Sequence, residues 1–401
     1  MGARPGAGNG MVGPMESSSE ATRSGALRAP AELPFEHLDL AALGGQIGPE
    51  PEDFVVDEVP LYAAAGQGDH WYVRLGKRER TTADLKRAVA QAASVPEREL
   101  GHAGLKDKHA VTSQWLSVPV PRSTPPSAWQ LPEPYRLLEV TRHGNKLRIG
   151  HLEGNRFRIR LVGMAPGALA AAAALCQRIA EQGIGNCFGS QRFGLGQRNL
   201  ETALTLLQRR RLGPRAGQRG KFLASVIQSE IFNRYLILRS ELGRQRLLAG
   251  DVVRLQGSRA VFVVADPEKE APRLAAGDIH LTGPLVGPKM KASEGQPLEL
   301  ERAVLASLGL DEDGLRELGR SAPGTRRDLL LRPDGLTWQP DAAQPGSLVV
   351  EFSLPSGAYA SLVIRALTRQ DPWSGANAEG DEREDPAGEE RTPESAEHDS
   401  A

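Results

Sequence analysis

The chain has 401 residues, 40% of them hydrophobic, which is enough for two domains or one large domain with a substantial core. Its two cysteines, Cys176 and Cys187, form no CxxC pair, which excludes a disulfide framework and a structural zinc site of the usual spacing. The longest apolar run, residues 168–176, is far shorter than the roughly 20 residues needed to span a bilayer. The N-terminus also lacks the apolar segment of a secretory signal. We therefore expect a cytoplasmic protein in a reducing compartment.

The net charge of −1 conceals an uneven distribution of charged residues. Residues 371–401 carry eleven acidic and two basic side chains among Gly, Ala, Pro and Ser, a composition typical of a disordered tail. We interpret residues 1–33 as a second disordered extension. Because residues 1–30 carry +1, the segment from 31 to 370 carries +7. A basic body indicates a polyanionic partner such as nucleic acid.

The first patterned segment predicts two strands followed by a helix. Residues 54–59 and 70–75 are rich in β-branched and aromatic side chains, as is typical of strands, and a Gly-rich turn separates them. Thr81 or Thr82 can cap a helix in which apolar residues recur at helical spacing. A Gly-rich loop then leads to a strand predicted at 110–118.

In that loop, Asp107 stands between Lys106 and Lys108, with His109 beside them. Nearby positive charge favours the ionised form of a carboxylate, and an ionised, positioned carboxylate can act as a nucleophile. Loops on a rigid scaffold commonly carry catalytic groups. Turn formation is nevertheless the commoner role of an aspartate beside Gly and Lys, so residue types alone leave both interpretations open.

Two further strands are predicted at 146–152 and 156–162, joined by a Glu-Gly-Asn turn. In the second strand, Arg156, Arg158 and Arg160 alternate with apolar residues, so that one face is apolar and the other cationic. The cationic face is either a solvated outer surface, which is the commoner case, or a contact for a phosphate backbone.

The second half of the chain alternates between helical and strand patterns. Helices are predicted at 168–182, 222–242 and 300–308. A basic Gly-rich linker at 209–221 marks a change in composition, and strand character returns at 348–352. This pattern suits a second domain inserted into the first.

Aromatic and amide side chains in two later loops are candidates for recognising a nucleic-acid base. Asn186 and Phe188 lie in a Gly-rich loop, and Tyr359 lies in a loop near the end of the predicted fold. An amide can read the edge of a base, and aromatic rings can stack on its face. Packing in the core is the commoner role of any one aromatic residue.

Generic catalytic signatures are absent from the sequence. There is no Walker A, HExxH or GxSxG motif, so nucleoside-triphosphate and zinc chemistry are not expected. His102 and His109 show no metal-ligand spacing, and we interpret them as structural or RNA-facing residues, not as general bases.

Six segments spread over about residues 45–368 carry the most specific signal in the chain. They are Pro51-Glu-Asp-Phe-Val-Val56, Ala103-Gly-Leu-Lys-Asp-Lys-His-Ala-Val-Thr112 with Gln114-Trp115, Asn186-Cys-Phe-Gly-Ser-Gln-Arg-Phe-Gly194, Gln228-Ser-Glu-Ile-Phe-Asn233, Thr282-Gly-Pro-Leu285 and Leu354-Pro-Ser-Gly-Ala-Tyr359. In this order they closely resemble the TruD family of tRNA pseudouridine synthases. The combined match is highly specific, although no single segment would be.

The resemblance implies an enzyme that isomerises a uridine of tRNA to pseudouridine, uridine 13 of the D arm in typical bacterial members, without cofactor or metal. It implies an α+β fold: a pseudouridine synthase fold with a mixed, mostly antiparallel sheet, interrupted by an inserted α/β TRUD domain. We place the catalytic domain at 34–211 and 332–370, the inserted domain at 212–331 and the acidic tail at 371–401. We expect tRNA as the partner of a monomer that binds no membrane and no small-molecule cofactor.

Carried over by motif, the resemblance makes Asp107 the catalytic aspartate. It implies that Phe54, Asn186 and Tyr359 contact the target nucleotide, and that Phe188 stacks on the base. Further candidates for contact with RNA are basic residues near these motifs: Lys106, Lys108, His109 and Arg192.

The chain departs from the family pattern just before the Pro-Glu-Asp-Phe segment. Family members usually carry there a basic residue thought to pair with the catalytic carboxylate, whereas this chain has Gly48. Either Arg192, Lys106 or another cation supplies that charge, or the pairing is dispensable. In addition, Cys187 stands where an aromatic residue is common, and Tyr359 where phenylalanine is common.

Two other functions stay open at the level of sequence. One is a catalytically inactive tRNA-binding or RNA-chaperone protein, for which Gly48 is the main support. The other is an RNA hydrolase that uses Asp107 as a general base. For an isomerase, the carboxylate could attack C1′, add to the uracil ring or assist elimination to a glycal, and the sequence does not separate these routes.

Overall fold

A computed structural model describes residues 32–34, 36–194, 198–370 and 372 of the chain. Most of the expected N-terminal extension and of the expected acidic tail lies outside these described residues. The largest sheet in the described residues has nine strands. These strands are β1 (Gly44–Ile47), β2 (Phe54–Pro60), β3 (His70–Arg78), β4 (Gly101–His102), β5 (Val111–Pro119), β6 (Arg136–His143), β7 (Leu152–Met164), β14 (Asp334–Pro340) and β15 (Leu348–Pro355).

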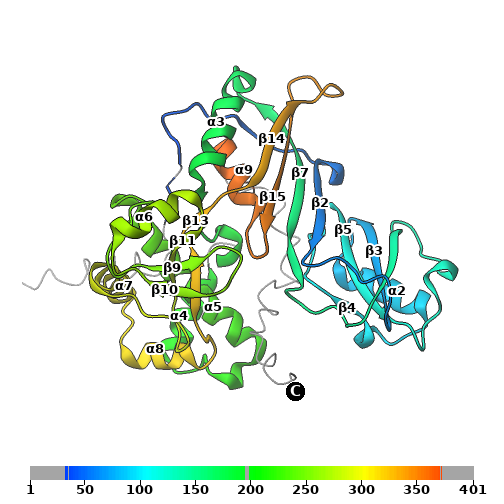
Figure 1. Cartoon of the computed structure of the whole chain (residues 1–401), viewed down its shortest axis with the longest axis horizontal. Helices are drawn as coiled ribbons and strands as arrows, with labels where there is room; N and C mark the ends of the chain where they lie inside the picture. The colour runs from blue at the N-terminus through cyan, green and yellow to red at the C-terminus, as the bar shows by residue number, and fades with distance from the viewer. Residues whose placement is uncertain (1–31, 35, 195–197, 371, 373–401) are drawn as a thin grey trace, which may run out of the picture.

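The order of strands in this sheet is β14-β15-β7-β2-β5-β3-β6, with β1 beside β7 and β4 beside β5. Neighbouring strands are antiparallel except for β2 and β5, which are parallel. The sheet is therefore mixed and mostly antiparallel, and the α+β prediction is confirmed. Strands β14 and β15 come from the last part of the chain, so two distant segments build one sheet (Figure 1).

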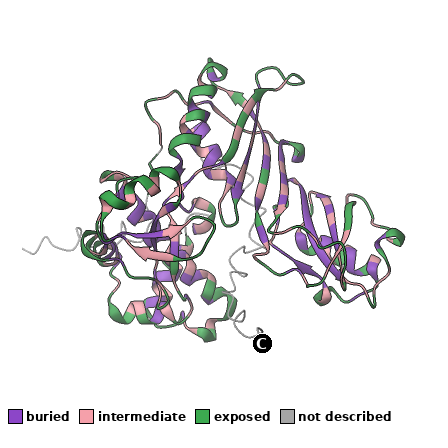
Figure 2. Cartoon of the chain, in the orientation of Figure 1, coloured by how far each residue is buried: buried purple, intermediate pink, exposed green. Residues whose placement is uncertain are grey.

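Three helices flank this sheet: α2 (Thr82–Ala93), α3 (Ala168–Gln182) and α9 (Ala360–Thr368). Strand pairing and side-chain alternation put Phe157, Phe352 and Leu116 on the same face. Leu116 shares a hydrophobic core with α2, and the two phenylalanines share one with α3 and α9. We call this helix-covered surface the inner face, and Figure 2 shows purple, buried segments along these strands and helices.

The segment from β8 to β13 forms most of a second lobe (Figure 1). Its strands pair in the order β10-β9-β11-β12, and β8 pairs with β13 in a separate two-stranded sheet. Its elements are β8 (Ile184–Gly185), α4 (Arg198–Gln208), α5 (Gly217–Glu241), β9 (Val252–Leu255), β10 (Val261–Val263), α6 (Pro267–Ala276), β11 (Ile279–Leu285), α7 (Gly295–Ser307), α8 (Glu312–Gly319), β12 (Thr325–Asp328) and β13 (Leu330–Leu331). Helix α4 packs against α5 and α8. The domain boundaries at 212 and 331 stay a prediction.

Local sequence signals predicted the start of helix α2 correctly. Thr81 is the cap of α2, and its hydroxyl accepts a hydrogen bond from the Asp84 N–H at 3.0 Å. Helix α5 begins at Gly217, inside the segment predicted to be a linker. No helix among the described residues is long and apolar enough to cross a membrane.

The prediction of two strands joined by a Glu-Gly-Asn turn is wrong. A single strand, β7, passes through this segment without a turn. Gly154 pairs with Val59 on one side and with Pro355 on the other. A Cβ at Gly154 would lie 2.1 Å from the carbonyl oxygen of Leu354. The glycine therefore allows a close approach between two strands. In the sequence, this glycine resembles one that forms a turn.

The arginines that alternate along β7 lie on the outer face, opposite the helices. Arg156 and Arg158 both lie near Glu351, with N–O distances of 3.0 and 3.7 Å. Arg160 pairs with Asp341 at 2.6 Å and also with Asp53. Because each of these cations has an acidic partner, the structure favours a solvated outer surface over a contact for phosphate.

Replacing Gly154 with alanine should lower the free energy of unfolding by about 1–3 kcal/mol, because the added methyl group overpacks the contact between β7 and β15. Gly144→Ala is the control, since no atom lies within 4 Å of a Cβ at that position. Urea unfolding followed by circular dichroism measures both variants. Equal stability of the two variants would contradict the close approach.

Candidate active site

Asp107 lies on an exposed loop between β4 and β5, and Lys108 and His109 beside it are exposed as well. The loop returns to the sheet at Val111, where β5 begins. Because β2 and β5 are parallel neighbours, Phe54 at the start of β2 lies at the same end of the sheet as the residues before Val111. The fold thus puts Asp107 and Phe54 on adjoining elements.

Lys77, near the end of β3, holds the backbone of this loop. Its side chain is only 2% exposed. Its ammonium group donates to the carbonyl oxygen of Asp107 at 2.7 Å and to that of Lys106 at 3.3 Å. A further hydrogen bond goes to the carbonyl oxygen of Arg80. Three acceptors match the three donors of an ammonium group, so a cation is fixed in contact with the Asp107 backbone.

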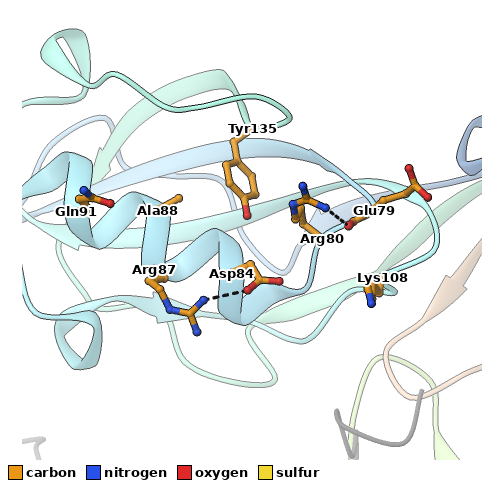
Figure 3. Close-up of a pocket in the computed structure, with 8 residues that line it drawn as sticks. All are labelled: Glu79, Arg80, Asp84, Arg87, Ala88, Gln91, Lys108 and Tyr135. Atoms are coloured by element: carbon orange, nitrogen blue, oxygen red, sulfur yellow. Dashed lines mark hydrogen bonds and ion pairs between the residues drawn. The ribbon is translucent and has the colours of Figure 1, made fainter. Parts of the chain in front are cut away.

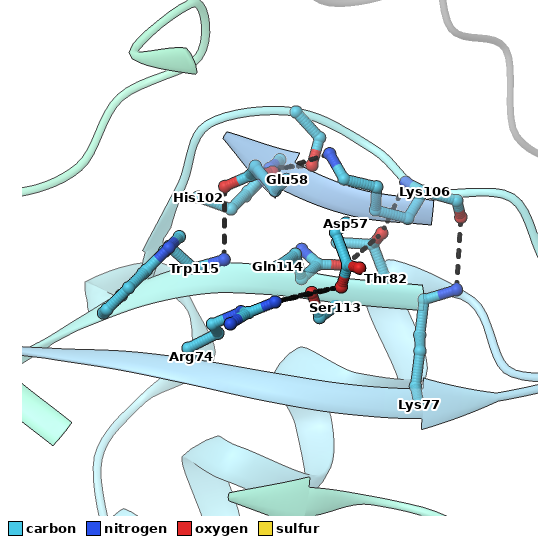
Figure 4. A network of polar contacts seen from close by, with 11 residues as sticks. Asp57, Glu58, Arg74, Lys77, Thr82, His102, Lys106, Ser113, Gln114 and Trp115 are labelled. Atoms are coloured by element: carbon cyan, nitrogen blue, oxygen red, sulfur yellow. Dashed lines mark hydrogen bonds and ion pairs between the residues drawn. The ribbon is translucent and has the colours of Figure 1, made fainter. Parts of the chain in front are cut away.

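A buried ion pair between Lys106 and Glu58 provides a second anchor (Figure 4). The ammonium nitrogen lies 2.6 Å from the carboxylate, and the two side chains are 3% and 1% exposed. The backbone N–H of Lys106 also donates to the hydroxyl of Thr82 at 3.0 Å, and the N–H of Trp115 donates to Glu58 at 3.1 Å. Lys106, a candidate for contact with RNA, therefore points into the protein and anchors the loop.

Gly48, which replaces the usual basic residue, leaves no room for a side chain. A Cβ at this position would lie 2.0 Å from Oδ2 of Asp53. Asp53 is buried, accepts a hydrogen bond from the Glu50 N–H at 3.0 Å and pairs with Arg160. Lys77 contacts the backbone carbonyl of Asp107, not its carboxylate.

Asn186 and Phe188 contact Arg327, and the ring of Tyr359 lies near that of Phe188; we call these four residues the aromatic slot. The guanidinium carbon of Arg327 lies 4.4 Å from the centre of the Phe188 ring. Nη2 of Arg327 donates to Oδ1 of Asn186 at 2.6 Å, and Nε donates to the Asn186 carbonyl oxygen at 3.0 Å. The rings of Phe188 and Tyr359 lie 6.5 Å apart, centre to centre. A planar cation is thus held against an aromatic ring and an amide.

The second lobe fixes Phe188 in this slot. The side chain of Asn233, from α5, accepts from the Phe188 N–H at 2.8 Å and donates to its carbonyl oxygen at 2.9 Å. Phe232 packs edge-on against the ring at 5.7 Å. The guanidinium of Arg192 lies 5.6 Å from the same ring and donates to the Ser229 hydroxyl at 3.2 Å. Arg192 therefore belongs to the surroundings of Phe188.

Phe54 lies outside the aromatic slot, on the inner face of the sheet. Its ring centre is 6.1 Å from that of Phe157, which stacks on Phe352 at 5.4 Å. These rings run across β2, β7 and β15, from the strand beside the Asp107 loop to the strand that leads to Tyr359. The sheet is therefore the common support of the loop and the slot.

Three residues with clear roles escaped the sequence analysis: Lys77, Asn233 and Arg327. A signal for Lys77 exists, since it follows Val73 and Leu75 at alternate, inner-face positions and so marks a lysine directed toward the core. Asn233 lies within one of the six matching segments but has no local pattern of its own. Arg327 reaches the slot from β12, and only pairing within the second lobe brings it there.

The described residues offer little support for a cysteine nucleophile or for a metal site. Burial raises the pKa of Cys176 and Cys187 to about 11, so neither thiol ionises at neutral pH. No group of three or more His, Cys, Asp or Glu residues in the described ranges could hold a metal ion.

The family profile described as tRNA pseudouridine synthase D (TruD) matches residues 36–210 and 220–367. The chain belongs to the TruD family. As a member it is an isomerase of the class that converts uridine to pseudouridine in tRNA. The family expected from the sequence is thereby confirmed.

Named relatives agree with this assignment over nearly their full length. A protein of Anaeromyxobacter sp. (strain Fw109-5), named tRNA pseudouridine synthase D, is 40% identical over 348 residues, 84% of this chain and 96% of the relative. A protein of the same name from Thermus thermophilus is 38% identical, covering 87% of this chain and 96% of the relative. A crystal structure of a protein from Methanosarcina mazei, assigned to tRNA pseudouridine synthase D, shares the fold, with a TM-score of 0.67 and 25% identity over 86% of this chain and 98% of that one.

Lys106→Met should lower the free energy of unfolding by about 3–5 kcal/mol, because it leaves the carboxylate of Glu58 buried without a partner charge. Lys108→Met removes an exposed lysine two positions away and should change the stability by less than about 0.5 kcal/mol. Chemical unfolding of both variants tests the anchor. Wild-type stability of Lys106→Met would show that the ion pair does not hold the loop.

Proposed function

We propose that this TruD-family enzyme isomerises uridine 13 in the D arm of tRNA, with Asp107 as the nucleophile and the target base flipped out of its stack. The observation that carries the proposal is an exposed aspartate whose loop is pinned by two buried lysines, Lys77 and Lys106. Such a loop fixes the Asp107 backbone while its side chain stays exposed. The name that the relatives bear supports tRNA as the substrate.

The reaction needs a positioned carboxylate more than any other group. The bond between N1 and C1′ breaks, the uracil turns, and C5 bonds to C1′, while a proton leaves C5 and a proton joins N1. Atoms and electrons balance within the nucleoside. Asp107 can attack C1′, add to the ring or assist elimination to a glycal, and in each route its carboxylate is ionised. Nearby cations, Lys77 beneath the loop and Lys108 beside it, favour that form.

The aromatic slot suits the flipped base. Uracil, like a guanidinium group, is planar and carries polar groups on its edge, so it can stack on an aromatic ring of the slot while Arg327 keeps its hydrogen bonds to Asn186. Asn186 then offers its amide to the base edge, with Tyr359 and Phe54 nearby. Stacking on an aromatic side chain stabilises a base by about 1–3 kcal/mol, which is comparable to the few kcal/mol that unstacking costs.

The proposal also includes the localisation, oligomeric state and partners that we expect from the sequence. The enzyme acts in the cytoplasm as a monomer, binds no small-molecule cofactor, and meets the phosphates of tRNA with exposed cations. Lys108, His109 and Arg192 are the candidates for those contacts that lie beside the loop or the slot.

Asp107→Asn should reduce pseudouridine formation by at least about 10³-fold, since an amide cannot act as the nucleophile. Binding of tRNA should change little, because the amide keeps the size of the carboxylate. Asp69→Asn, on the turn between β2 and β3, is the control. Mass-based mapping of pseudouridine in total tRNA, with and without the protein, measures activity and target position together.

The same experiment separates the alternatives. Unchanged turnover by Asp107→Asn would remove the nucleophile assignment, and a wild-type protein that binds tRNA without modifying it would support the inactive RNA-binding function. Strand scission or base release would indicate a hydrolase. Modification at a different uridine would overturn the choice of position 13 alone.

Arg327→Lys should lower kcat/KM by about 10- to 100-fold, the effect of a small misplacement of a catalytic contact. A lysine keeps the charge but cannot hold the Asn186 amide and carbonyl with one planar fork. Affinity for tRNA should stay within about twofold, since the charge is retained. Arg273→Lys is the matched control, because Arg273, in α6, lies 5.6 Å from the ring of Phe262 and away from the slot. Equal turnover of the two variants would contradict a role for Arg327 in orienting Asn186.

A further inference from the structure

A surface pocket of about 430 Å³ lies between the start of α2 and the Asp107 loop (Figure 3). Lys108, next to Asp107, and Tyr135, just before β6, both line it. Arg80 and Arg87 also line it. A volume of this size is typical of sites for small molecules or single nucleotides. The mechanism described above does not use this pocket.

The two acids that line the pocket are already engaged with neighbouring groups. Asp84 accepts from the N–H and hydroxyl of Thr81 at 3.2 and 2.8 Å, and pairs with Arg87 at 3.0 Å. Glu79 pairs with Arg78. The negative charge of these two acids is therefore offset within the protein, and the exposed cations that line the pocket face solvent.

Arg80 and Tyr135 present complementary chemistry in this pocket. Arg80 is exposed, and its Nη1 donates to the Glu79 carbonyl oxygen at 3.0 Å, which orients the guanidinium group. Tyr135 is half-buried, and burial raises the pKa of its hydroxyl above the usual range, so it stays protonated and can donate a hydrogen bond. A phosphate-binding cation, a ring and a hydroxyl donor are the groups that bind a nucleotide of single-stranded RNA.

The wall of the pocket is connected to the Asp107 loop. The buried ammonium of Lys77 donates both to the carbonyl oxygen of Arg80 and to that of Asp107. The N–H of Glu79 donates to the carbonyl oxygen of Ala110 at 3.2 Å. Glu79 itself has a φ of 52°, in the left-handed region that non-glycine residues seldom adopt. Strained residues of this kind cluster at functional sites.

We propose that this pocket binds a nucleotide of the tRNA strand next to the target uridine, with its phosphate at Arg80 and Lys108 and its base or ribose against Tyr135. The inference rests on the proposed function and extends it from the target base to its neighbour in the chain. Since Lys77 bonds to the backbone at Arg80 and at Asp107, a neighbour seated in the pocket is held at a fixed place relative to the carboxylate. The pocket thereby contributes to the choice of the uridine that is modified.

Filling the pocket tests the proposal without changing its charge. Ala88→Phe puts a ring into the pocket, whereas Ala83→Phe puts the same ring on an exposed position of the same helix. Ala88→Phe should raise the Kd for tRNA and the KM by about 10-fold, the scale of one lost stacked base. Ala83→Phe should leave both within about twofold of wild type. Equal affinities of the two variants would overturn the proposal.

Measuring Kd as well as turnover keeps this failure distinct from failure of the proposed function. If the wild-type protein forms no pseudouridine, the proposed reaction is wrong, yet the comparison of tRNA affinities still shows whether the pocket holds RNA. Circular dichroism and thermal unfolding check that both variants are folded.

The salt dependence of binding tests the phosphate contact separately. Arg80→Ala should reduce the slope of log Kd against log salt concentration by about 1, the value for one lost phosphate contact. The backbone carbonyl that Lys77 uses is unaffected by this change. Arg122→Ala, in the exposed connection between β5 and β6, should leave the slope at its wild-type value. A wild-type slope for Arg80→Ala would show that no phosphate binds there.

A photoreactive residue identifies the nucleotide. Replacing Tyr135 with p-benzoylphenylalanine and irradiating the complex with tRNA should produce a crosslink to a nucleotide next to the modified uridine. Crosslinks confined to distant parts of the tRNA would contradict the placement.

Discussion

Two buried ammonium groups hold the Asp107 loop against the sheet, and the geometry of the proposed site depends on them. Burying a charge costs several kcal/mol unless it is paired or fully hydrogen-bonded. Lys77 meets this requirement with three backbone carbonyl groups, and Lys106 meets it with the carboxylate of Glu58. Both lysines act on the residues around Asp107. A Gly-rich loop that would otherwise have many conformations is thus tied to β2 and β3, while the Asp107 side chain stays exposed.

The two sides of the site come from parts of the chain that are remote in sequence. The loop with Asp107 is close in sequence to β5, whereas Arg327 comes from β12 of the second lobe and Tyr359 follows β15. The inner face of the sheet supports both sides through the stacked rings of Phe54, Phe157 and Phe352. A guanidinium group lies on the Phe188 ring. This stacking of a planar cation on an aromatic ring supports our proposal that a planar base stacks there.

The basic residues of this protein differ in whether acidic side chains compensate their charge. The arginines of β7, which alternate with apolar residues in the sequence, lie on the outer face beside Glu351, Asp53 and Asp341. Their charge is compensated within the protein. Exposed cations lie beside the loop, at Lys108, and at the pocket next to it. This distribution of charge favours the loop and α2 over the outer face of the sheet for the phosphate contacts that we propose.

The sequence by itself determined the family and the α+β class, and it supplied the candidate residues for the chemistry. Motifs such as the one around Asp107 consist of consecutive residues, so their identity does not depend on how the chain folds. The cap of α2 at Thr81 was also predictable, because a capping box involves only residues three apart.

Other features were decided only by the tertiary structure, because they depend on which strands become neighbours. Gly154 looked like a turn, yet the approach of β15 makes it the middle of a strand. Lys106 looked like a surface cation, yet Glu58 on β2 draws it into the interior. Because Gly48 stands where a basic residue is usual, the sequence did not identify a cation near Asp107. In the folded chain, Asp53 fills the space beside Gly48, and Lys77, from another strand, contacts the backbone of the Asp107 loop.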